Sequence, residues 1–247
     1  MKLKSILKKN SGRSNGKLTV RHQGGRAKRF LRAIDFRRQK KDVWAKVEAI
    51  EYDPNRNARI AKLVYADGQR SYIISPVGLI KDMKVISSAD APIEVGNCLP
   101  LSKIPVGTQI HNIEIRAGKG GQIARGAGIV AFVFGKDETN VLVKMPSGEI
   151  RKFDPNCFAT VGQVGNIDDK NKRLGKAGAN RWRGIRPTVR GIAMHPDAHP
   201  HGGGEGRSGV GLKYPKTPWG KKAVGKTRFN RKYSNRSIVE GRQRGKK

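Results

Sequence analysis

Three histidines and a carboxylate lie close together between positions 195 and 205. His195, His199 and His201, with Glu205 nearby, could ligate zinc, or one imidazole could act as a general base. The stretch has neither an H-E-x-x-H motif nor paired Cys and His at zinc spacing. It also offers no Ser or Cys in a recognisable nucleophile arrangement. We therefore predict no metal, no cofactor and no catalytic residue here, and we expect the histidines to pack and to form hydrogen bonds.

The surrounding segment, residues 180–207, combines flat cations with glycine and proline. Proline fixes φ and consecutive glycines raise chain entropy, so neither a helix nor a strand is expected to continue through it. Guanidinium groups beside glycine let cations and backbone amides approach a polyanion closely. The segment is therefore expected to bind RNA and to be ordered by it. Its candidate contact residues are Arg181, Trp182, Arg183, Arg186, Arg190, His199, His201, Gly202, Gly203, Gly204 and Arg207.

Residues 220–227, GKKAVGKT, fit the P-loop formula G-x-x-x-x-G-K-[ST]. A working P-loop follows a strand and opens a helix, so that backbone amides and the helix dipole hold phosphates. Here prolines and Trp219 precede the motif, and the residues after it have no amphipathic pattern. We interpret the match as coincidental and expect Trp219, Lys226 and Arg228 to contact RNA instead.

Positive charge is concentrated at the two ends of the chain. The 247 residues include 52 Lys and Arg against 19 Asp and Glu, which gives a net charge of +33. Residues 1–42 hold 15 basic and 2 acidic residues, residues 43–165 hold 15 and 12, and residues 166–247 hold 22 and 5. The middle has the balance of an ordinary globular domain, whereas both ends repel themselves and are expected to order on a polyanion such as RNA.

Two cysteines, Cys98 and Cys157, belong to no C-x-x-C pair and lie in apolar contexts. This favours buried thiols in a reducing compartment over a disulfide or a metal site. No window approaches the roughly eighteen apolar residues of a membrane span, and no apolar signal core follows the basic residues 1–9. We therefore expect an intracellular protein with no membrane partner.

Short β-rich runs fill the middle of the chain and are separated by Gly, Pro and Asp turns. Regular short strands with almost no helical periodicity predict one or two closed β-barrels. Asp67-Gly68 between two such runs predicts a hairpin with a type I′ turn. Residues 1–28 are expected to be loop or tail, and strands are expected to stop after Gly165, with a turn or two of helix around residues 170–176. The runs cover residues 31–36, 43–53, 58–75, 108–115, 128–135, 140–146 and 149–154.

Several long phrases carry a family resemblance. RWRGIRPTVRGIAM, HPHGGGEGR and TPWGKKAVGKTR, preceded by EYDPNRNARIAKLVYADGQRSYI, PVGTQIHNIEI, AGKGGQIARGAG and LGKAGANRWRG, resemble the bacterial-type ribosomal protein L2 family in the expected order. The resemblance implies an all-β fold, with an OB-like barrel followed by an SH3-like barrel and long irregular basic N- and C-terminal extensions. We expect a basic N-terminal arm at residues 1–28, the OB-like barrel at 29–92, the SH3-like barrel at 93–165 and the RNA-binding extension at 166–247.

The resemblance also implies a function. The family is a structural constituent of the large ribosomal subunit that binds 23S-type rRNA and supports subunit association, tRNA binding and the architecture of the peptidyl-transferase centre, while RNA performs the chemistry. The implied partners are large-subunit rRNA, other ribosomal proteins, the small subunit across the intersubunit face and, indirectly, the tRNA region, in a cytoplasmic or an organellar ribosome. Basic residues in the barrel loops are expected to hold RNA as well, namely Arg56, Arg59, Lys119 and Arg125.

The sequence departs from the family at a few points, and two other classes stay open. His195 stands where the family usually has Asn, Asp197-Ala198 stands where it has Val-Asp, and the match begins downstream of the family's usual leader, whose roles are not carried over. An RNA chaperone or translation factor could use similar barrels but would lack the fixed phrases of the C-terminal extension. A P-loop or histidine enzyme would need a rigid scaffold around its motif.

Overall fold

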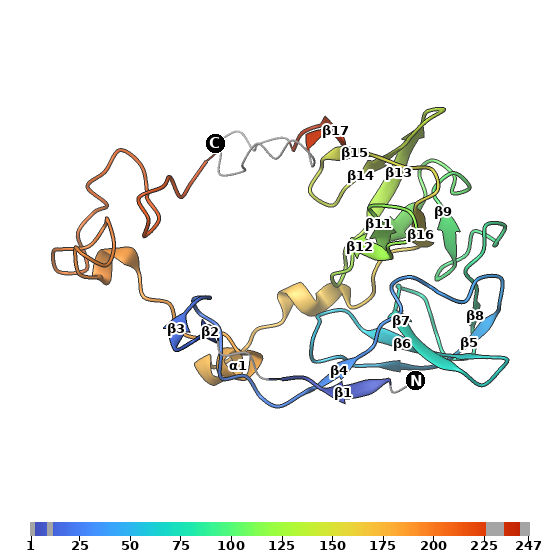
Figure 1. The fold of residues 1–247 in the computed structure, drawn as a ribbon, viewed down its shortest axis with the longest axis horizontal. Helices are drawn as coiled ribbons and strands as arrows, with labels where there is room; N and C mark the ends of the chain where they lie inside the picture. The colour runs from blue at the N-terminus through green and yellow to red at the C-terminus, as the bar shows by residue number, and fades with distance from the viewer. Residues whose placement is uncertain (1–2, 9–11, 226–234, 243–247) are drawn as a thin grey trace. The chain divides into compact units, whose positions relative to one another are not determined.

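A computed structural model describes residues 3–8, 12–225 and 235–242 (Figure 1). The described residues divide into two compact units. We call residues 3–7, 28–173 and 235–242 the barrel unit, and residues 8, 12–27 and 174–225 the extension unit. Strands predominate over helices, so the fold is all-β, as the sequence predicts. The domain boundaries expected from the sequence stay a prediction.

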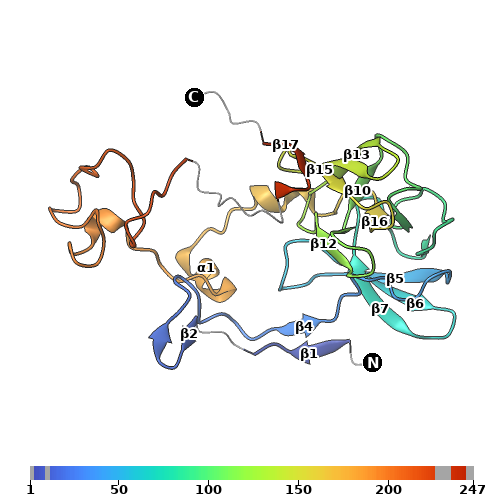
Figure 2. The same cartoon turned by 45° about the horizontal axis from the view of Figure 1, so that its top comes forward.

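The first sheet of the barrel unit has four antiparallel strands in the order β7-β6-β5-β8, of which β5, β6 and β7 are labelled in Figure 2. They are β5 (Ala45–Glu51), β6 (Ile60–Tyr65), β7 (Arg70–Ile74) and β8 (Lys84–Val85). Val47 and Leu63 face each other across β5 and β6, and neither is exposed to solvent. A bulge between Val47 and Ala49 interrupts their ladder, and bulges increase the local twist that curls a sheet. The buried cluster beneath the sheet comprises Ala45, Val47, Ala61, Leu63, Tyr65, Ile73, Leu79 and Val85.

The hairpin joining β6 and β7 is confirmed, but its predicted turn type is wrong. A type I′ turn needs positive φ at both central residues. Gly68 has φ 75°, whereas Asp67 is not in the left-handed region. The Gly68 N–H donates to the Tyr65 carbonyl at 2.9 Å, and the Tyr65 N–H donates to the Gln69 carbonyl at 3.0 Å. The loop therefore has three residues with Gly68 in the left-handed bulge position, and the Asp67 carboxylate stabilises it by accepting from the Gln69 N–H at 3.1 Å.

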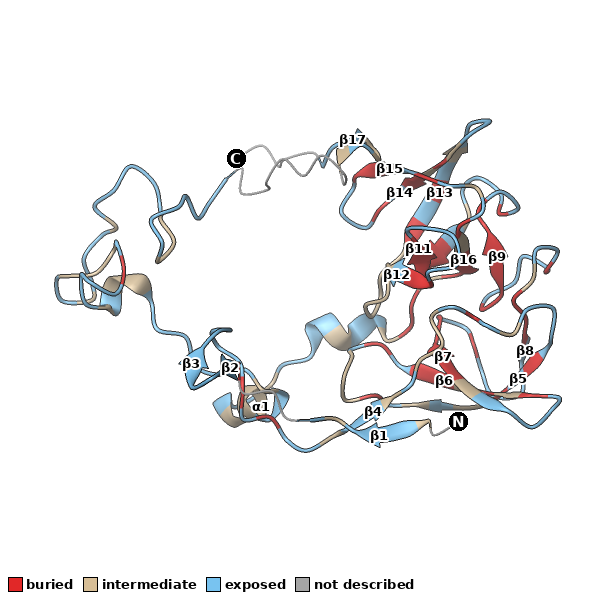
Figure 3. Cartoon of the chain, viewed as in Figure 1, coloured by how far each residue is buried: buried red, intermediate tan, exposed pale blue. Residues whose placement is uncertain are grey.

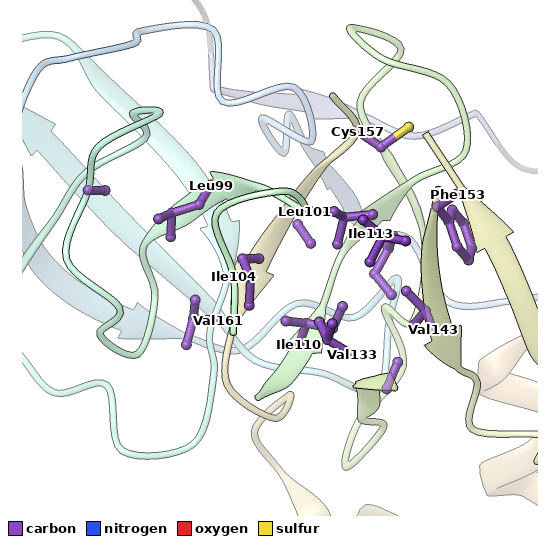
Figure 4. Close-up of a cluster of buried hydrophobic side chains, with 14 of the residues drawn as sticks. Leu99, Leu101, Ile104, Ile110, Ile113, Val133, Val143, Phe153, Cys157 and Val161 are labelled. Atoms are coloured by element: carbon purple, nitrogen blue, oxygen red, sulfur yellow. The ribbon is translucent and has the colours of Figure 1, made fainter. Parts of the chain in front are cut away.

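The second sheet of the barrel unit has seven antiparallel strands in the order β17-β15-β14-β13-β10-β16-β9. Its strands are β9 (Cys98–Pro100), β10 (Gln109–His111), β13 (Ala131–Lys136), β14 (Val141–Lys144), β15 (Ile150–Phe153), β16 (Phe158–Val161) and β17 (Ile238–Glu240). A separate two-stranded ladder, β11 (Ile113–Glu114) with β12 (Gly121–Ile123), lies beside it. Aliphatic side chains such as Ile110, Val133 and Val143 converge in its core (Figure 4).

Both cysteines are buried, as predicted. Cys157 belongs to the core of the second sheet, and Cys98 is 3% exposed. Burial, and to a smaller extent the nearby Asp154 carboxylate, raises the pKa of the Cys157 thiol to about 11. A thiol with a raised pKa stays protonated at neutral pH, so it serves packing rather than nucleophilic chemistry.

The chain ends hold more regular structure than the sequence predicts. At the N-terminus, β1 (Lys4–Ile6) pairs with β4 (Phe30–Arg32), and β2 (Arg13–Ser14) pairs with β3 (Lys17–Leu18), so the expectation of loop or tail is wrong there. Strand β17 pairs with β15, so strands do not stop after Gly165. These pairings rest on backbone hydrogen bonds between mostly exposed strands, which leave no apolar alternation in the sequence.

The predicted helical turn around residues 170–176 is confirmed only at its start. A short 3₁₀ helix, η1 (Ile167–Asn171), overlaps the beginning of that segment, and the α-helix α1 (Ala177–Arg183) follows directly after it. A second 3₁₀ turn, η2 (Gly191–Ala193), lies further along the extension unit. The helix thus includes the Arg-Trp-Arg stretch that composition alone assigns to irregular chain.

His111 on β10 makes the stability of the barrel unit depend on pH. It is 1% exposed, and its Nδ1 lies 2.8 Å from the Gly162 carbonyl oxygen, to which a neutral ring donates. Burial is the largest cause that lowers its pKa to about 4, and the Arg38 charge acts in the same direction. Because the folded pKa lies below the ordinary value near 6.5, the neutral ring contributes stability above that pH, which is lost as pH falls toward 4.

We expect protonation of His111 to lower the free energy of unfolding by roughly 3 kcal/mol between pH 6.5 and 4, since one pKa unit corresponds to about 1.4 kcal/mol. Denaturant unfolding of the whole chain at several pH values measures this. The matched variant His111→Asn keeps an N–H donor for the Gly162 carbonyl but cannot titrate. Wild-type and variant profiles that run parallel across this pH window would contradict the assignment.

Candidate nucleic-acid interface

The extension unit is held together by segments that lie far apart in the sequence. Residues 22–27 run beside residues 182–187, and backbone hydrogen bonds join them. The Gly24 N–H donates to the Gly184 carbonyl at 2.9 Å, and the Arg186 N–H donates to the His22 carbonyl at 3.0 Å. The basic N-terminal segment and the basic C-terminal segment, which composition treats as two separate tails, therefore form one structure.

Gly184 ends helix α1 at the point where these segments meet. It has φ 93°, and its N–H donates to the Arg181 carbonyl at 2.9 Å. A Cβ at this position would lie 2.9 Å from the Cβ of Arg26. Glycine is thus required both for the left-handed helix end and for the close packing of Arg26. Arg26 itself is 7% exposed and donates from Nη2 to the Lys8 carbonyl at 2.6 Å, so it is a structural arginine.

Helix α1 presents an aromatic ring and cations to solvent. Trp182 is 58% exposed, and the Lys176 ammonium lies 4.9 Å from the centre of its ring. The guanidinium groups of Arg183, Arg186 and Arg190 are exposed and form no ion pair with any described residue. Arg181 is partly buried, and its Nη2 lies close to Gly25. Exposed, unpaired guanidinium groups beside an exposed indole can meet phosphates and stack on a base.

A basic cavity of about 590 Å³ lies within the extension unit. Its described lining includes three arginines and a histidine but no carboxylate, which suits an anionic ligand. Arg13, Arg21 and His22 were not predicted from the sequence, because they meet Arg186 only through the pairing of distant segments, which leaves no local signal. The lining residues are Arg13, Leu18, Arg21, His22, Gln23, Gly24, Gly25, Arg186, Pro187, Val189 and Met194.

The histidine loop is ordered by contacts within the chain. His199 is 8% exposed, its Nδ1 accepts from the His201 N–H at 3.0 Å, and the His201 Nε2 accepts from the Lys216 N–H at 2.8 Å. Burial, with smaller effects of His201 and Arg21, lowers the pKa of His199, which favours the neutral ring that can accept this bond. The expectation that only RNA orders this segment is therefore wrong for His199.

His195 is exposed, and its Nδ1 lies 3.2 Å from the Asp197 Oδ2. The described residues contain no group of His, Cys, Asp and Glu arranged to hold a metal ion.

The three consecutive glycines meet requirements of the chain itself. A Cβ on Gly202 would lie 2.4 Å from the His195 carbonyl oxygen and 2.7 Å from that of Met194. Gly203 and Gly204 have φ of 97° and 80°, in the left-handed region. The sequence predicts that glycine here admits RNA, and the structure provides an independent reason for glycine, which is the close approach of the loop to its own backbone. Arg207, just beyond, is exposed.

The described part of the P-loop-like motif begins in a tight turn. The Gly220 N–H donates to the Thr217 carbonyl at 2.9 Å. The backbones of Lys216 and Lys222 form an isolated antiparallel β-bridge. Trp219 is at the turn and is 76% exposed. The motif does not follow a strand, and residues 220–225 form no helix. Lys226 and Arg228 lie outside the described residues.

The barrel unit places the predicted Arg56 and Arg125 around one aromatic ring. Their guanidinium carbons lie 5.7 Å and 4.4 Å from the centre of the Phe36 ring. The Arg56 Nε also donates to the buried Asp53 carboxylate at 2.6 Å, so much of its charge is compensated internally. Burial, and then repulsion by Arg56, lowers the pKa of Arg125. Both guanidinium groups lie over one ring, and Arg125 forms no ion pair with the described residues, so the site suits an additional anion.

The two other predicted barrel residues, Arg59 and Lys119, are exposed and form no ion pair with the described residues. Lys119, Arg125 and Phe36 line a cavity of about 360 Å³ together with residues of the 33–39 segment and β7. The structure thus brings Lys119 and Arg125 into one cavity lining, and Arg56 contacts the Phe36 ring of the same lining. Arg59 is exposed and is not part of that lining.

Glu114 organises the loop that carries Lys119. This carboxylate is 3% exposed and accepts from the N–H groups of Gly118 at 3.1 Å, Gly120 at 2.7 Å and Phe158 at 3.0 Å. The sequence did not predict this role of Glu114, because its hydrogen-bond donors come together only when the 115–120 loop folds back and Phe158 approaches from elsewhere in the chain. These three hydrogen bonds fix the conformation of the loop and therefore the position of the Lys119 backbone from which its side chain extends.

Buried residues gather in the strands of the barrel unit, whereas most of the extension unit is exposed or intermediate (Figure 3). Among the described residues, we find no helix with the length and apolar character to cross a membrane. A large exposed basic surface on a small buried framework is typical of proteins that bind nucleic acid.

Comparison with known families agrees with this interface. Residues 1–87 match the family model described as Ribosomal Proteins L2, RNA binding N-terminal domain, and residues 94–220 match Ribosomal Proteins L2, C-terminal domain. The two matches follow each other in sequence and together cover most of the chain. The chain therefore belongs to the ribosomal protein L2 family, the RNA-binding structural proteins of the large ribosomal subunit.

Proposed function

We propose that this chain binds 23S-type rRNA of the large subunit through both units and supports subunit association, tRNA binding and the architecture of the peptidyl-transferase centre, where RNA performs the chemistry. The observation that carries the proposal is that the guanidinium groups of Arg183, Arg186 and Arg190 are exposed and form no ion pair with the described residues, and that Arg186 lines a cavity whose described lining has no carboxylate. Folding has already joined the segments that carry them, so part of the ordering cost of binding is met before RNA arrives.

The contact residues fall into three proposed classes. Arg183, Arg186, Arg190, Arg207, Lys226 and Arg228, with Arg59, Lys119 and Arg125 of the barrel unit, contact phosphates. Trp182 and Trp219, which are 58% and 76% exposed, stack on bases. Arg56, Arg181, His199, His201 and Gly202–Gly204 act mainly by shaping the surfaces on which the first two classes lie, since their contacts are largely within the chain.

The proposed domains are the N-terminal arm at 1–28, the OB-like barrel at 29–92, the SH3-like barrel at 93–165 and the RNA-binding extension at 166–247. Besides rRNA and other ribosomal proteins, the proposed partners are the small subunit at the intersubunit face and, indirectly, the tRNA region. GKKAVGKT at 220–227 is not a nucleotide site in this proposal, because its described residues, 220–225, begin in a turn that follows no strand.

The affinity for an isolated large-subunit rRNA fragment is expected to fall steeply with salt. If ten or more Lys and Arg meet phosphates, log affinity should fall by roughly 0.7 to 0.9 per contact for each unit of log salt. Arg186→Gln should reduce that slope by about one contact. Lys103→Gln, which removes a cation already paired with Asp90, serves as the control and should not change the slope. A wild-type slope equivalent to two or three contacts would contradict the proposal.

A high-salt wash of native ribosomes tests the place of the protein in the subunit. An embedded structural protein should co-sediment with large subunits after the wash, because its contacts are numerous and partly enclosed by RNA. A translation factor or RNA chaperone that cycles on and off should be released. Release of the chain at moderate salt, with the subunits otherwise intact, would favour that alternative.

A further inference from the structure

Two phenylalanines lie exposed on the outer side of β13. Phe132 is 37% exposed and Phe134 is 54% exposed. Ala131, which precedes them, and Val133, which lies between them, are buried in the core. Burial alternates along β13 from Ala131 through Phe134, which places both rings on the exposed side of the strand. The exposed rings are therefore neighbours on one surface, and neither is among the residues predicted from the sequence to bind RNA.

Strand register places cations beside these rings. Phe132 pairs with Lys144 on β14 and with Gln109 on β10, and in the next row Leu142 of β14 pairs with Lys152 of β15. A bulge between Val133 and Gly135 adds a residue to β13 at Phe134. We call this surface, formed by Gln109, Phe132, Phe134, Leu142, Lys144 and Lys152, the β13 face.

The charges around the β13 face are not balanced. Lys144 and Lys152 are exposed and form no ion pair with the described residues. The nearest carboxylates in sequence are Asp137 and Glu138, in the turn after β13, and Glu149, which is bound to Arg151 at 2.6 Å. The six residues of the face carry two positive charges. One exposed carboxylate, Glu240 of β17, lies at its edge in the row of Phe132 and Lys144, beyond Ile150, so the net charge there stays positive.

We propose that the β13 face is a further RNA-binding surface, on which two unpaired nucleotides of a single-stranded segment stack on Phe132 and Phe134 while Lys144 and Lys152 contact their phosphates. Aromatic rings on an exposed sheet with cations at the edge suit splayed bases, because every base has a flat apolar face and the backbone is anionic. The two rings belong to separate residues of the strand, and in this proposal each ring takes its own base. An apolar protein partner is less well matched, since two ammonium groups would have to be buried with only the Glu240 carboxylate at the edge of the face.

The affinity test uses the full chain and a fluorescent single-stranded RNA hexamer of mixed sequence, at salt high enough to suppress purely electrostatic binding elsewhere on the molecule. Phe132→Ala and Phe134→Ala should each weaken this binding by roughly 5- to 150-fold, the range reported by alanine substitution at stacked bases. Phe132→Tyr and Phe134→Tyr should retain it. Val106→Ala, which trims a 57% exposed aliphatic side chain of the same unit, is the control and should have no effect.

Mapping of the contact separates this surface from the extension unit. Ultraviolet crosslinking of the same hexamer, followed by tryptic digestion, should yield RNA adducts on the peptide of residues 126–136, and the double alanine variant should lose them. Adducts confined to other peptides, with alanine variants binding within twofold of wild type, would overturn the proposal. A lysine-reactive reagent that joins Lys144 or Lys152 to another protein in intact subunits, with no RNA adduct on this peptide, would overturn it in favour of a protein-docking face.

Discussion

Gly202→Ala is expected to disrupt the histidine loop and to reduce incorporation into large subunits by about tenfold or more. The added Cβ would lie 2.4 Å from the His195 carbonyl oxygen, a distance that forces backbone rather than a flexible side chain to move. Displacement of residues 194–202 would break the bond from the His201 N–H to the His199 Nδ1. Strain of this kind costs on the order of 3 kcal/mol, and 1.4 kcal/mol corresponds to a factor of ten in an equilibrium.

Competition with wild-type protein during subunit reconstitution measures incorporation, and hydrogen exchange of the 194–203 amides in free protein measures loop order. Gly209→Ala is the matched control, because its Cβ would meet no atom within 4 Å and its φ lies outside the left-handed region. If Gly202→Ala incorporates as well as Gly209→Ala, the loop does not depend on this close approach.

Two further variants separate architecture from enzymology. Gly203→Val should also impair incorporation, since φ of 97° is strained for a branched residue. Lys226→Ala, which would abolish a true P-loop, removes one of 52 basic residues and should have a much smaller effect. ATP hydrolysis by purified protein that disappears in Lys226→Ala would reverse this conclusion.

Glu114→Ala is expected to destabilise the barrel unit by about 3 kcal/mol or more. The change leaves the N–H groups of Gly118, Gly120 and Phe158 without their acceptor, and an unsatisfied buried polar group costs about 1 to 3 kcal/mol. Partial entry of water into the space left by the carboxylate would offset some of this cost, which is why the full sum of three groups is not expected.

Denaturant unfolding measures the stability loss, and the salt-dependent affinity for rRNA measures the effect on Lys119. Glu138→Ala, an exposed carboxylate of the same unit, should change stability by less than about 0.5 kcal/mol. Glu114→Gln should lie between the two, because its amide oxygen can still accept while its NH₂ group meets donors. A Glu114→Ala protein as stable as Glu138→Ala would show that the loop does not rely on this carboxylate.

The fold class and the family were determined by the sequence, because both rest on local signals. Alternating runs around turn residues give short strands wherever they occur, and the Asp67-Gly68 hairpin followed from two adjacent runs. The polycationic ends pointed to an anionic partner, since like charges at that density oppose collapse in any arrangement. Burial of Cys98 and Cys157 likewise followed from their apolar neighbours.

Only the tertiary structure decided how the basic ends are arranged and which of their residues remain free to bind. The pairing of residues 22–27 with 182–187 joins segments about 160 positions apart, packs Gly184 against Arg26 and brings together both sides of the basic cavity. The turn at Gly68, the burial of His199 and the donors around Glu114 likewise depend on contacts that composition does not record. Sequence patterns report on neighbours along the chain, whereas these contacts are set by the geometry of the folded chain. Two arginines that look alike in the sequence therefore have different roles: Arg26 is buried and holds the fold together, while Arg186 is exposed and lines the basic cavity.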